Sequence, residues 1–239
     1  MQPLDNPIWQ ALTTTHAGLA ETCDEACKFP SEVSILAGFP QPTPENFASL
    51  ATLLTPEESV GLFLQHLPDP PPSWNVVSTA PLLQMLCENA SLSLPRRSPS
   101  TPEFIELAQS DVPEMLALTK LTKPGPFGAR TREMGDYLGI RCGGTLVAMA
   151  GERLRLPGYT EISAVCTHPH HLGNGYASAL MVELIHRICR RDELPFLHVR
   201  PENTRAIQVY ERLGFKKRTS FHYVVLRLQA EQDLPGTSP

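Results

Sequence analysis

Apolar and polar positions alternate in blocks along the chain, and these blocks predict a mixed α/β protein. Residues 161–167 form a short apolar run that is typical of a buried strand. After a turn that contains glycine, apolar residues recur at helical spacing from Ala177 to Ile188 and predict an amphipathic helix. A second apolar run, 196–200, predicts another strand. Because strand–helix–strand crossovers are right-handed, we expect these two strands to be parallel neighbours.

The rest of the second half predicts mostly antiparallel strands. Asp111 and the following residues resemble a helix start, with Pro113 near the first turn. Gly143 and Gly144 suit a tight hairpin, and Gly151 interrupts a long strand and indicates a bulge. We expect a mixed, twisted sheet that is flanked by helices and includes strands at 104–108, 137–141, 145–156 and 220–228.

The first hundred residues are rich in proline and predict a smaller α/β domain. Helices are expected to begin at Asn6-Pro7 and Thr43-Pro44, which offer a capping residue followed by proline. Short apolar runs predict strands at 60–65 and 74–77. We divide the chain into an N-terminal domain, a second domain and a disordered tail, at 1–100, 101–230 and 231–239, with the linker at 94–101.

Charge and composition exclude several classes of protein. A net charge of −5 over 239 residues argues against general nucleic-acid binding, which rests on a clustered basic surface. No run approaches the roughly 20 apolar residues that cross a bilayer, and the first residues lack a signal-peptide pattern. The 6 cysteines are scattered, as reduced thiols would be. We therefore expect a cytoplasmic protein with no membrane partner.

The turn before the long helix carries candidate ligand chemistry. Gly173 and Gly175 lack a Cβ, so the chain can adopt positive φ there and a ligand can approach the backbone. Amide groups at a helix N-terminus favour phosphate. A tight connection without a ligand is the alternative interpretation. Two later features favour the functional one: the strand at 196–200, and a helix that Asn203 caps and Gly214 ends.

These elements occur in a characteristic order. The motifs are Val-x-x-x-Pro-x-x-x-Gly-x-Gly, from Val165, and Asn-x-x-Ala-x-x-x-Tyr-x-x-x-Gly-Phe, from Asn203. With them, the sequence resembles the GCN5-related N-acetyltransferase (GNAT) superfamily, and most closely its FR47-like branch, over about residues 103–228. The resemblance implies that superfamily's mostly antiparallel sheet. The resemblance also suggests that the N-terminal domain is a degenerate copy of the same fold. The alternative is that this domain only packs against the rest of the chain and stabilises it.

The resemblance also implies a function, which is acyl transfer from acetyl-CoA to a primary amine by direct attack in a ternary complex. The partners would be acetyl-CoA and the amine, without a metal, on a monomer or homodimer. The alternatives are a non-catalytic acyl-CoA-binding regulatory module and a structural interaction protein. The implied cofactor-binding residues are Val165, Cys166, Thr167, His170, His171, Leu172, Gly173, Asn174, Gly175, Tyr176, Ala177 and Asn203.

One residue departs from the superfamily's pattern. The position three residues before the first glycine is usually Gln or Arg, and here it is His170. Backbone amides make the main contacts to pyrophosphate, so the change concerns an auxiliary contact. His168, His170 and His171 lie in one turn without a carboxylate or cysteine at ligand spacing, so we expect no metal site. Cys166 is interpreted as a small packing residue rather than a nucleophile.

Candidate catalytic residues follow from the same comparison. Tyr210 is the implied proton donor, because a phenol stays protonated at neutral pH and can pass a proton to a thiolate; packing is the alternative. Glu161 is the candidate base, directly or through water, and an exposed strand-end glutamate is its alternative. His168 is the rival base. Phe127 and Arg130 are weaker candidates for acceptor contacts, with a loop anchor and a solvated charge as alternatives.

Overall fold

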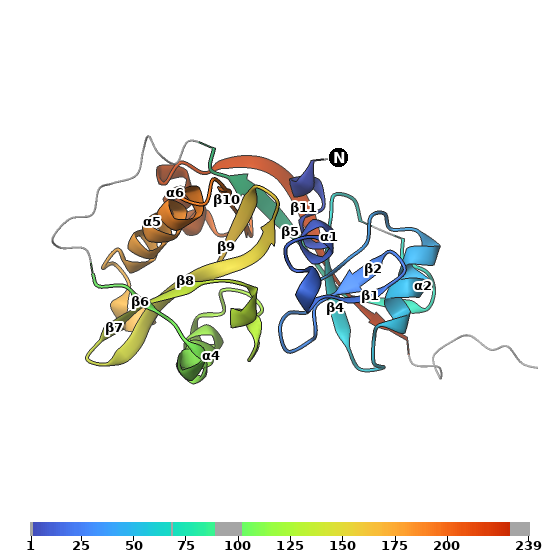
Figure 1. Ribbon diagram of the computed structural model, residues 1–239, viewed down its shortest axis with the longest axis horizontal. Coiled ribbons are helices and arrows are strands. Elements are labelled where there is room, and N and C mark those ends of the chain that lie inside the picture. Colours follow the sequence, from blue (N-terminus) through green and yellow to red (C-terminus); the bar gives the residue numbers. More distant parts are fainter. Residues whose placement is uncertain (1, 68, 89–101, 230–239) are drawn as a thin grey trace, which may run out of the picture. The chain divides into compact units, whose positions relative to one another are not determined.

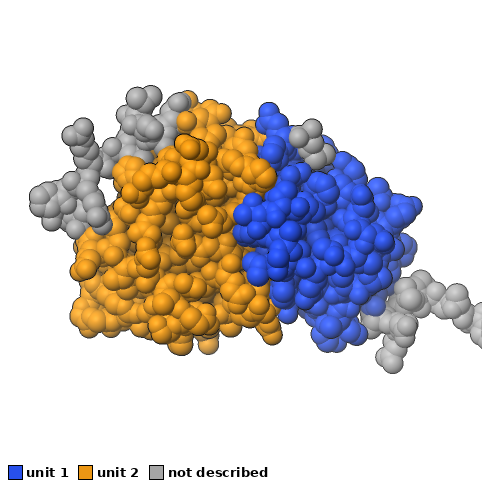
Figure 2. Space-filling view, viewed as in Figure 1, with its two compact units in different colours: residues 1–31, 35–82, 220–239 blue, residues 32–34, 83–219 orange. Residues whose placement is uncertain are grey.

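The computed structural model describes residues 2–67, 69–88 and 102–229 (Figure 1). The chain divides into two compact units, which Figure 2 colours separately. Unit 1 comprises residues 1–31, 35–82 and 220–239, and unit 2 comprises residues 32–34 and 83–219. This division differs from the one expected from the sequence, since residues 220–228 group with unit 1. The expected linker at 94–101 and the expected tail at 231–239 both lie outside the described residues.

Unit 2 is built on a mixed sheet. Its strands follow the order β11-β5-β10-β9-β8-β7-β6, and β5 and β11 run on into unit 1. The neighbours β10 and β9 are parallel, whereas β6 to β9 pair antiparallel, so the predicted crossover is confirmed. The bounds are β5 (Trp74–Leu86), β6 (Ile105–Glu106), β7 (Tyr137–Cys142), β8 (Thr145–Leu156), β9 (Tyr159–Thr167), β10 (Leu194–Val199) and β11 (Lys216–Leu228).

Helices flank this sheet, as predicted (Figure 1). They are α4 (Val112–Thr122), α5 (Tyr176–Cys189) and α6 (Thr204–Arg212), with short 3-10 turns η3 (Gln109–Asp111), η4 (Thr131–Met134) and η5 (Pro169–His171). Pro113 occupies the first turn of α4, where its missing N–H costs no helical hydrogen bond. Asn203 caps α6, since its side chain accepts a hydrogen bond from the Ala206 amide at 3.2 Å. Both expected helix starts are confirmed.

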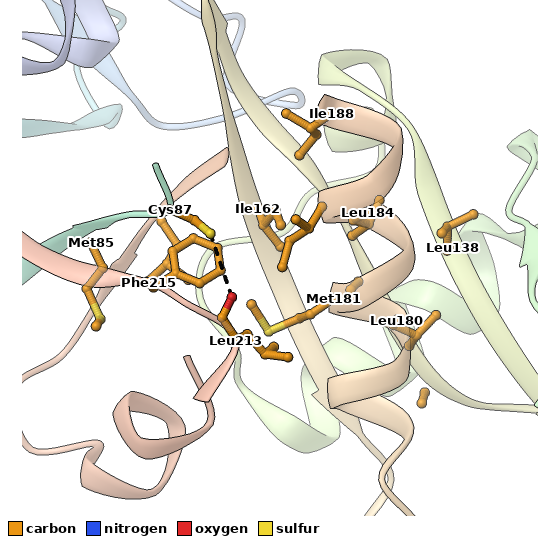
Figure 3. Packing of buried hydrophobic residues seen from close by; sticks show 14 of the residues in the cluster. Met85, Cys87, Leu138, Ile162, Leu180, Met181, Leu184, Ile188, Leu213 and Phe215 are labelled. Atoms are coloured by element: carbon orange, nitrogen blue, oxygen red, sulfur yellow. Dashed lines mark hydrogen bonds between the residues drawn. The ribbon is translucent and has the colours of Figure 1, made fainter. Parts of the chain in front are cut away.

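Two apolar clusters fix β8 and β9 from opposite faces. Leu180, Met181, Leu184 and Ile188 project from one face of α5 into the first cluster, together with Leu138 and Ile162 (Figure 3). The Cys87 thiol, at the end of β5, lies 3.6 Å from the Leu213 carbonyl in the same region. A second cluster joins α4 to the other face and includes Met115, Tyr137 and Cys166. Between Ile162 and Cys166, β9 is therefore packed on both faces.

Glycine shapes the hairpin between β7 and β8. Gly143 and Gly144 have φ of 57° and 84°, which a tight turn requires and L-residues resist. A register shift does lie between Met149 and Gly151, but the extra residue belongs to the partner strand β9, between Ser163 and Cys166, and not to the strand of Gly151 as predicted. A Cβ on Gly151 would lie 2.2 Å from the ring of Tyr137, which is buried. Gly151 is therefore required by close packing.

Unit 1 contains small elements around its own apolar cluster. Its helices are α1 (Pro7–Thr13) and α2 (Pro44–Thr52), with η1 (Pro3–Asp5) and η2 (Ala17–Leu19). A sheet of β1 (Glu21–Cys23), β2 (Ala26–Lys28) and β3 (Ala37–Gly38) was not predicted, while β4 (Ser59–Leu64) was, and it pairs with residues 222–227 of β11. Both predicted helices begin as expected. The idea that this region is a degenerate copy of the second domain stays a prediction.

Across residues 2–67, 69–88 and 102–229, none of the helices has the length and apolar character that crossing a membrane would require.

The packing at Gly151 gives a first prediction. Gly151→Ala forces its new methyl group against the buried Tyr137 ring, and we expect a loss of roughly 3 kcal/mol in the free energy of unfolding. Gly143→Ala, in the same hairpin, meets only open space and should lose about 1 kcal/mol through its positive φ. Urea unfolding of both variants measures the difference, and equal losses would contradict the packing argument.

Candidate functional site

The connection between β9 and α5 exposes backbone amides. Gly173 and Gly175 have φ of 86° and 74°, so the predicted positive φ is confirmed. A Cβ on either glycine would meet no atom within 4 Å, which shows open space in front of the loop. Gly175 is the N-cap of α5, and within the described residues no side chain forms a capping hydrogen bond to this helix. The first amides of a 14-residue helix thus face that space with the partial positive charge of its N-terminus.

The strands β9 and β10 part just before this loop. Their pairing comprises Leu194 with Tyr159, Pro195 with Thr160, and Phe196 with Glu161. Beyond that point β9 pairs only with β8, and β10 pairs with residues 83–86 of β5. Pro195 has no N–H to donate, which weakens the short ladder further. We call the opening between Ile162–Thr167 of β9 and Leu197–Val199 of β10 the fork.

A bulge bends β9 inside the fork. Three residue steps on β9, from Ser163 to Cys166, face two on β8, from Gly151 to Met149. Ala164 absorbs the extra residue with φ of 53°, a left-handed conformation that is costly for a residue with a Cβ. The bend redirects the peptide groups near Val165 and leaves the edge of β9 that faces away from β8 without a strand partner.

A cavity of about 730 Å³ meets the β9 side of the fork at Val165, Cys166 and Thr167. The end of β9, the glycine loop, the first turns of α5, one face of α6 and the end of α4 line it. Its lining includes most of the predicted ligand residues: Val165, Cys166, Thr167, His171, Leu172, Gly173, Gly175, Tyr176, Ala177, Asn203 and Tyr210. The predicted residues His170 and Asn174 are not part of the lining.

Sequence reasoning missed several lining residues. Ala206 lies four residues before Tyr210 on α6, and this helical spacing could have indicated it, whereas Val209 is the residue next to Tyr210 and has no such spacing. Arg205 and Arg212 come from the same helix and bring positive charge to the lining. Thr122, at the end of α4, is about fifty residues away in sequence from the glycine loop, so no local signal could have indicated it.

Tyr210 presents a protonated phenol to this cavity. It lies on α6 and its ring contacts Phe215 at a centroid distance of 6.2 Å. Gly214, with φ of 93°, turns the chain back so that the Phe215 amide donates to the Tyr210 carbonyl at 3.0 Å. Burial raises the pKa of Tyr210 to about 12. The phenol therefore keeps its proton at neutral pH and can act as a hydrogen-bond donor.

Cys166 also reaches the cavity, but as a thiol. It belongs to the apolar cluster under α4, and burial raises its pKa to about 11, opposed by hydrogen bonds from Thr122 and Met149. A thiol with that pKa is a weak nucleophile at neutral pH. This geometry agrees with a packing role.

Glu161 requires a correction, because it is not an exposed residue facing a substrate cleft. Its carboxylate is fully buried and accepts two hydrogen bonds from Arg153, at 2.9 and 2.6 Å, and one from His198 Nδ1 at 2.7 Å. Burial alone would raise its pKa, but Arg153 and His198 outweigh it and lower the pKa to about 2. A carboxylate held this way is a poor proton acceptor near neutral pH. Both partners come from neighbouring strands, so the sequence around Glu161 gives no sign of them.

The other predicted residues lie outside the cavity lining. His168 caps η5, where its Nδ1 accepts a hydrogen bond from the His170 amide at 3.2 Å. Phe127 packs edge-on against Tyr137. Arg130 forms an ion pair with Glu133 at 2.7 Å and another with Glu32 at 3.3 Å. Phe127 therefore anchors its loop, which was its alternative interpretation. The alternative for Arg130 was a solvated charge, and its side chain is 43% exposed but ion-paired.

The described part of the chain contains no group of three or more His, Cys, Asp or Glu side chains that could hold a metal ion.

Comparison with known proteins gives the fold and site a family. The family model of FR47-like proteins matches residues 137–224. The crystal structure of a GNAT-family protein from Novosphingobium aromaticivorans is 34% identical, covers 96% of this chain and 100% of its own, and superimposes with a TM-score of 0.87. The chain belongs to the GNAT family. GNAT acetyltransferases carry out acyl transfer and use acetyl-CoA.

Two other GNAT proteins are similar to this chain. N-alpha-acetyltransferase RimI from Mycobacterium tuberculosis is 35% identical over 101 residues, which amount to 39% of this chain and 63% of that protein. The match therefore spans less than two thirds of the curated relative. A GCN5-related N-acetyltransferase from Kribbella flavida has a TM-score of 0.59 at 17% identity, covers 95% of this chain and 98% of its own, and shows the shared fold alone.

The buried carboxylate predicts a pH-dependent stability. Because the folded-state pKa of Glu161 lies below its unfolded value of about 4.3, its contribution is present above that pH and is lost as the pH falls towards 2. Glu161→Gln should lower the free energy of unfolding by roughly 3 kcal/mol near neutral pH, since Arg153 loses its buried partner. The difference from wild type should shrink between pH 5 and pH 3 to about half or less.

Urea unfolding at several pH values measures this difference. Glu133→Gln is the matched control, since its partner Arg130 is 43% exposed and an exposed ion pair adds little to stability. A difference between Glu161→Gln and wild type that stays constant with pH would show that the carboxylate's ionisation is not the source of the stabilisation.

Proposed function

We propose that this protein transfers an acetyl group from acetyl-CoA to a primary amine by direct attack in a ternary complex. The observation that carries the proposal is one continuous cavity, which is lined by the open glycine loop, the unpaired edge of β9 and the phenol of Tyr210. The similarity to the GNAT-family structure over the whole chain supports it.

The residues present fit the phosphate end of acetyl-CoA. Gly173 and Gly175 leave open space where a side chain would stand, and the start of α5 directs its first amides into that space. Arg205 and Arg212 add positive charge to the cavity lining. His170 lies outside the lining, so the departure at this position leaves the backbone grip in place.

The unpaired edge of β9 fits the arm that carries the acetyl group. Residues Val165–Thr167 can hydrogen-bond an extended chain in the way a neighbouring strand would. An amide near Val165 or Cys166 would polarise the acetyl carbonyl oxygen and stabilise negative charge that develops on it. When bound, acetyl-CoA supplies the acetyl group as an activated thioester.

Tyr210 would act where the leaving sulfur accumulates negative charge. Its raised pKa keeps the proton on the phenol until that charge develops. A hydrogen bond from the phenol lowers the energy of the departing thiolate, and proton transfer completes the departure. The amine's own proton would pass to solvent water, because the Glu161 carboxylate is buried and ion-paired and His168 caps a turn.

The RimI relative is named as an N-alpha-acetyltransferase. On that basis we propose that a polypeptide α-amine is the first acceptor class to test, with small amines as the alternative.

The donor site can be tested by thermal stabilisation. Acetyl-CoA should raise the melting temperature of the wild type, since a ligand that binds only the folded state stabilises it. Gly173→Glu should abolish the shift, because the variant places a carboxylate where the phosphates would lie. Gly143→Glu, another open glycine with positive φ that lies in the β7–β8 turn, should keep the shift. No shift with wild type at saturating acetyl-CoA would contradict the donor site.

Turnover tests the role of Tyr210. With a peptide acceptor, Tyr210→Phe should lower kcat about 100-fold and leave the Kd for acetyl-CoA unchanged, measured by release of free thiol. Tyr159→Phe, at the opposite end of β9, is the matched control and should retain the wild-type rate. If wild type binds acetyl-CoA but transfers no acetyl group to any amine, the protein is a non-catalytic binding module. An unchanged kcat in Tyr210→Phe would remove the phenol from the mechanism.

A further inference from the structure

A row of polar side chains crosses the sheet of unit 2 at the closed end of the fork. Five adjacent strands contribute one residue each, and the row runs Arg218 (β11), Gln84 (β5), His198 (β10), Glu161 (β9) and Arg153 (β8). Neighbours are joined by hydrogen bonds of 2.9 Å between Arg218 and Gln84, 3.2 Å between Gln84 and His198, and 2.7 Å between His198 and Glu161. Arg153 closes the row with its two bonds to Glu161.

The centre of this row is fully buried. Gln84 and Glu161 are 0% exposed, and the His198 side chain is 1% exposed. A buried polar group without a hydrogen-bond partner has an uncompensated desolvation free energy. Each side chain in the row therefore favours the geometry that keeps its hydrogen bonds to its neighbours. The row therefore constrains distances between strands as well as side-chain positions.

Arg218, at one end of the row, determines which atoms donate and which accept in the hydrogen bonds that follow. Arg218 can only donate, so Gln84 presents its carbonyl oxygen to it and its amide nitrogen to His198. His198 Nε2 must then accept, which leaves its proton on Nδ1, where it is donated to Glu161. His198 is thus a neutral donor to an anionic carboxylate, and every bond in the row points towards Glu161.

The row of side-chain hydrogen bonds begins where the backbone pairing of β9 with β10 ends. The last pair between β9 and β10 is Glu161 with Phe196. Two residues further along β10, the His198 side chain reaches back to the Glu161 carboxylate. This bond spans the gap at the point where the two strands begin to separate.

We propose that His198 and Glu161 act as positioning residues that fix the separation of β9 and β10, and thereby the width of the fork that receives the acetyl-bearing arm of acetyl-CoA. The inference rests on the proposed function. Without the bond, the strands can pair further along their length or move apart, and either change alters the unpaired edge of β9. The glycine loop is held separately, by η5 and the N-terminus of α5, so its grip on phosphates does not depend on the row.

Calorimetric titration of two ligands against two variants tests this separation of roles. Acetyl-CoA contacts both fork and loop, whereas adenosine 3′,5′-bisphosphate carries phosphates without the acetyl-bearing arm. His198→Leu removes the donor to Glu161 and should weaken acetyl-CoA binding about tenfold, with binding of the bisphosphate unchanged. His198→Asn places an amide N–H near the position of Nδ1, and should restore acetyl-CoA binding to within about threefold of wild type.

Other results would overturn the inference. If both variants bind acetyl-CoA as wild type does, the row does not fix the separation of β9 and β10. If kcat falls in that case while binding is unchanged, His198 acts in proton transfer instead. If His198→Leu weakens both ligands equally, or if His198→Asn fails to restore binding, the loss comes from general damage to the fold. Wild type that binds neither ligand would overturn the proposed function itself, and with it the inference.

Discussion

The site depends on the short parallel pairing of β10 with β9. Parallel neighbours need a crossover, and here α5 provides it, so the helix must begin where β9 ends. Only three residue pairs form before the strands part, and Pro195 and the bulge at Ala164 keep the ladder short. The same connection therefore produces an unpaired strand edge and, a few residues later, a helix N-terminus with free amides. Both open onto one cavity.

Holding this opening requires structure on both sides of β9. Apolar residues of α5 pack on one face and those of α4 on the other, so the strand is fixed while one of its edges stays unpaired. Buried charges at the closed end of the fork are expensive, and a buried ion pair is often no better for stability than well-packed apolar residues. Arg153, Glu161 and His198 nevertheless stand there and satisfy one another. Their placement is better explained by the geometry they impose than by the stability they add.

Local rules predicted the parts of the structure that depend on neighbouring residues. The apolar stripe of α5, the positive φ of Gly173 and Gly175, and the Asn203 cap each follow from a few adjacent residues. Such rules could not predict contacts between residues that lie on different strands or helices. Glu161 was predicted to be a base, with an exposed strand end as the alternative, and neither interpretation could anticipate Arg153 and His198, which reach it from other strands. The strands of the β1–β2–β3 sheet are two or three residues long and show no periodicity, and the strand expected at 74–77 continues to Leu86 as β5.

Amide hydrogen exchange with and without acetyl-CoA tests the central claim most directly, since the claim concerns backbone N–H groups in two named segments. The account predicts slower exchange on binding at residues 172–177, where the glycine loop meets α5, and at residues 165–167 on the unpaired edge of β9, with no change in β1 to β3. Protection confined to other parts of the chain, or none at saturating acetyl-CoA, would contradict the assignment of the fork and glycine loop as the donor site.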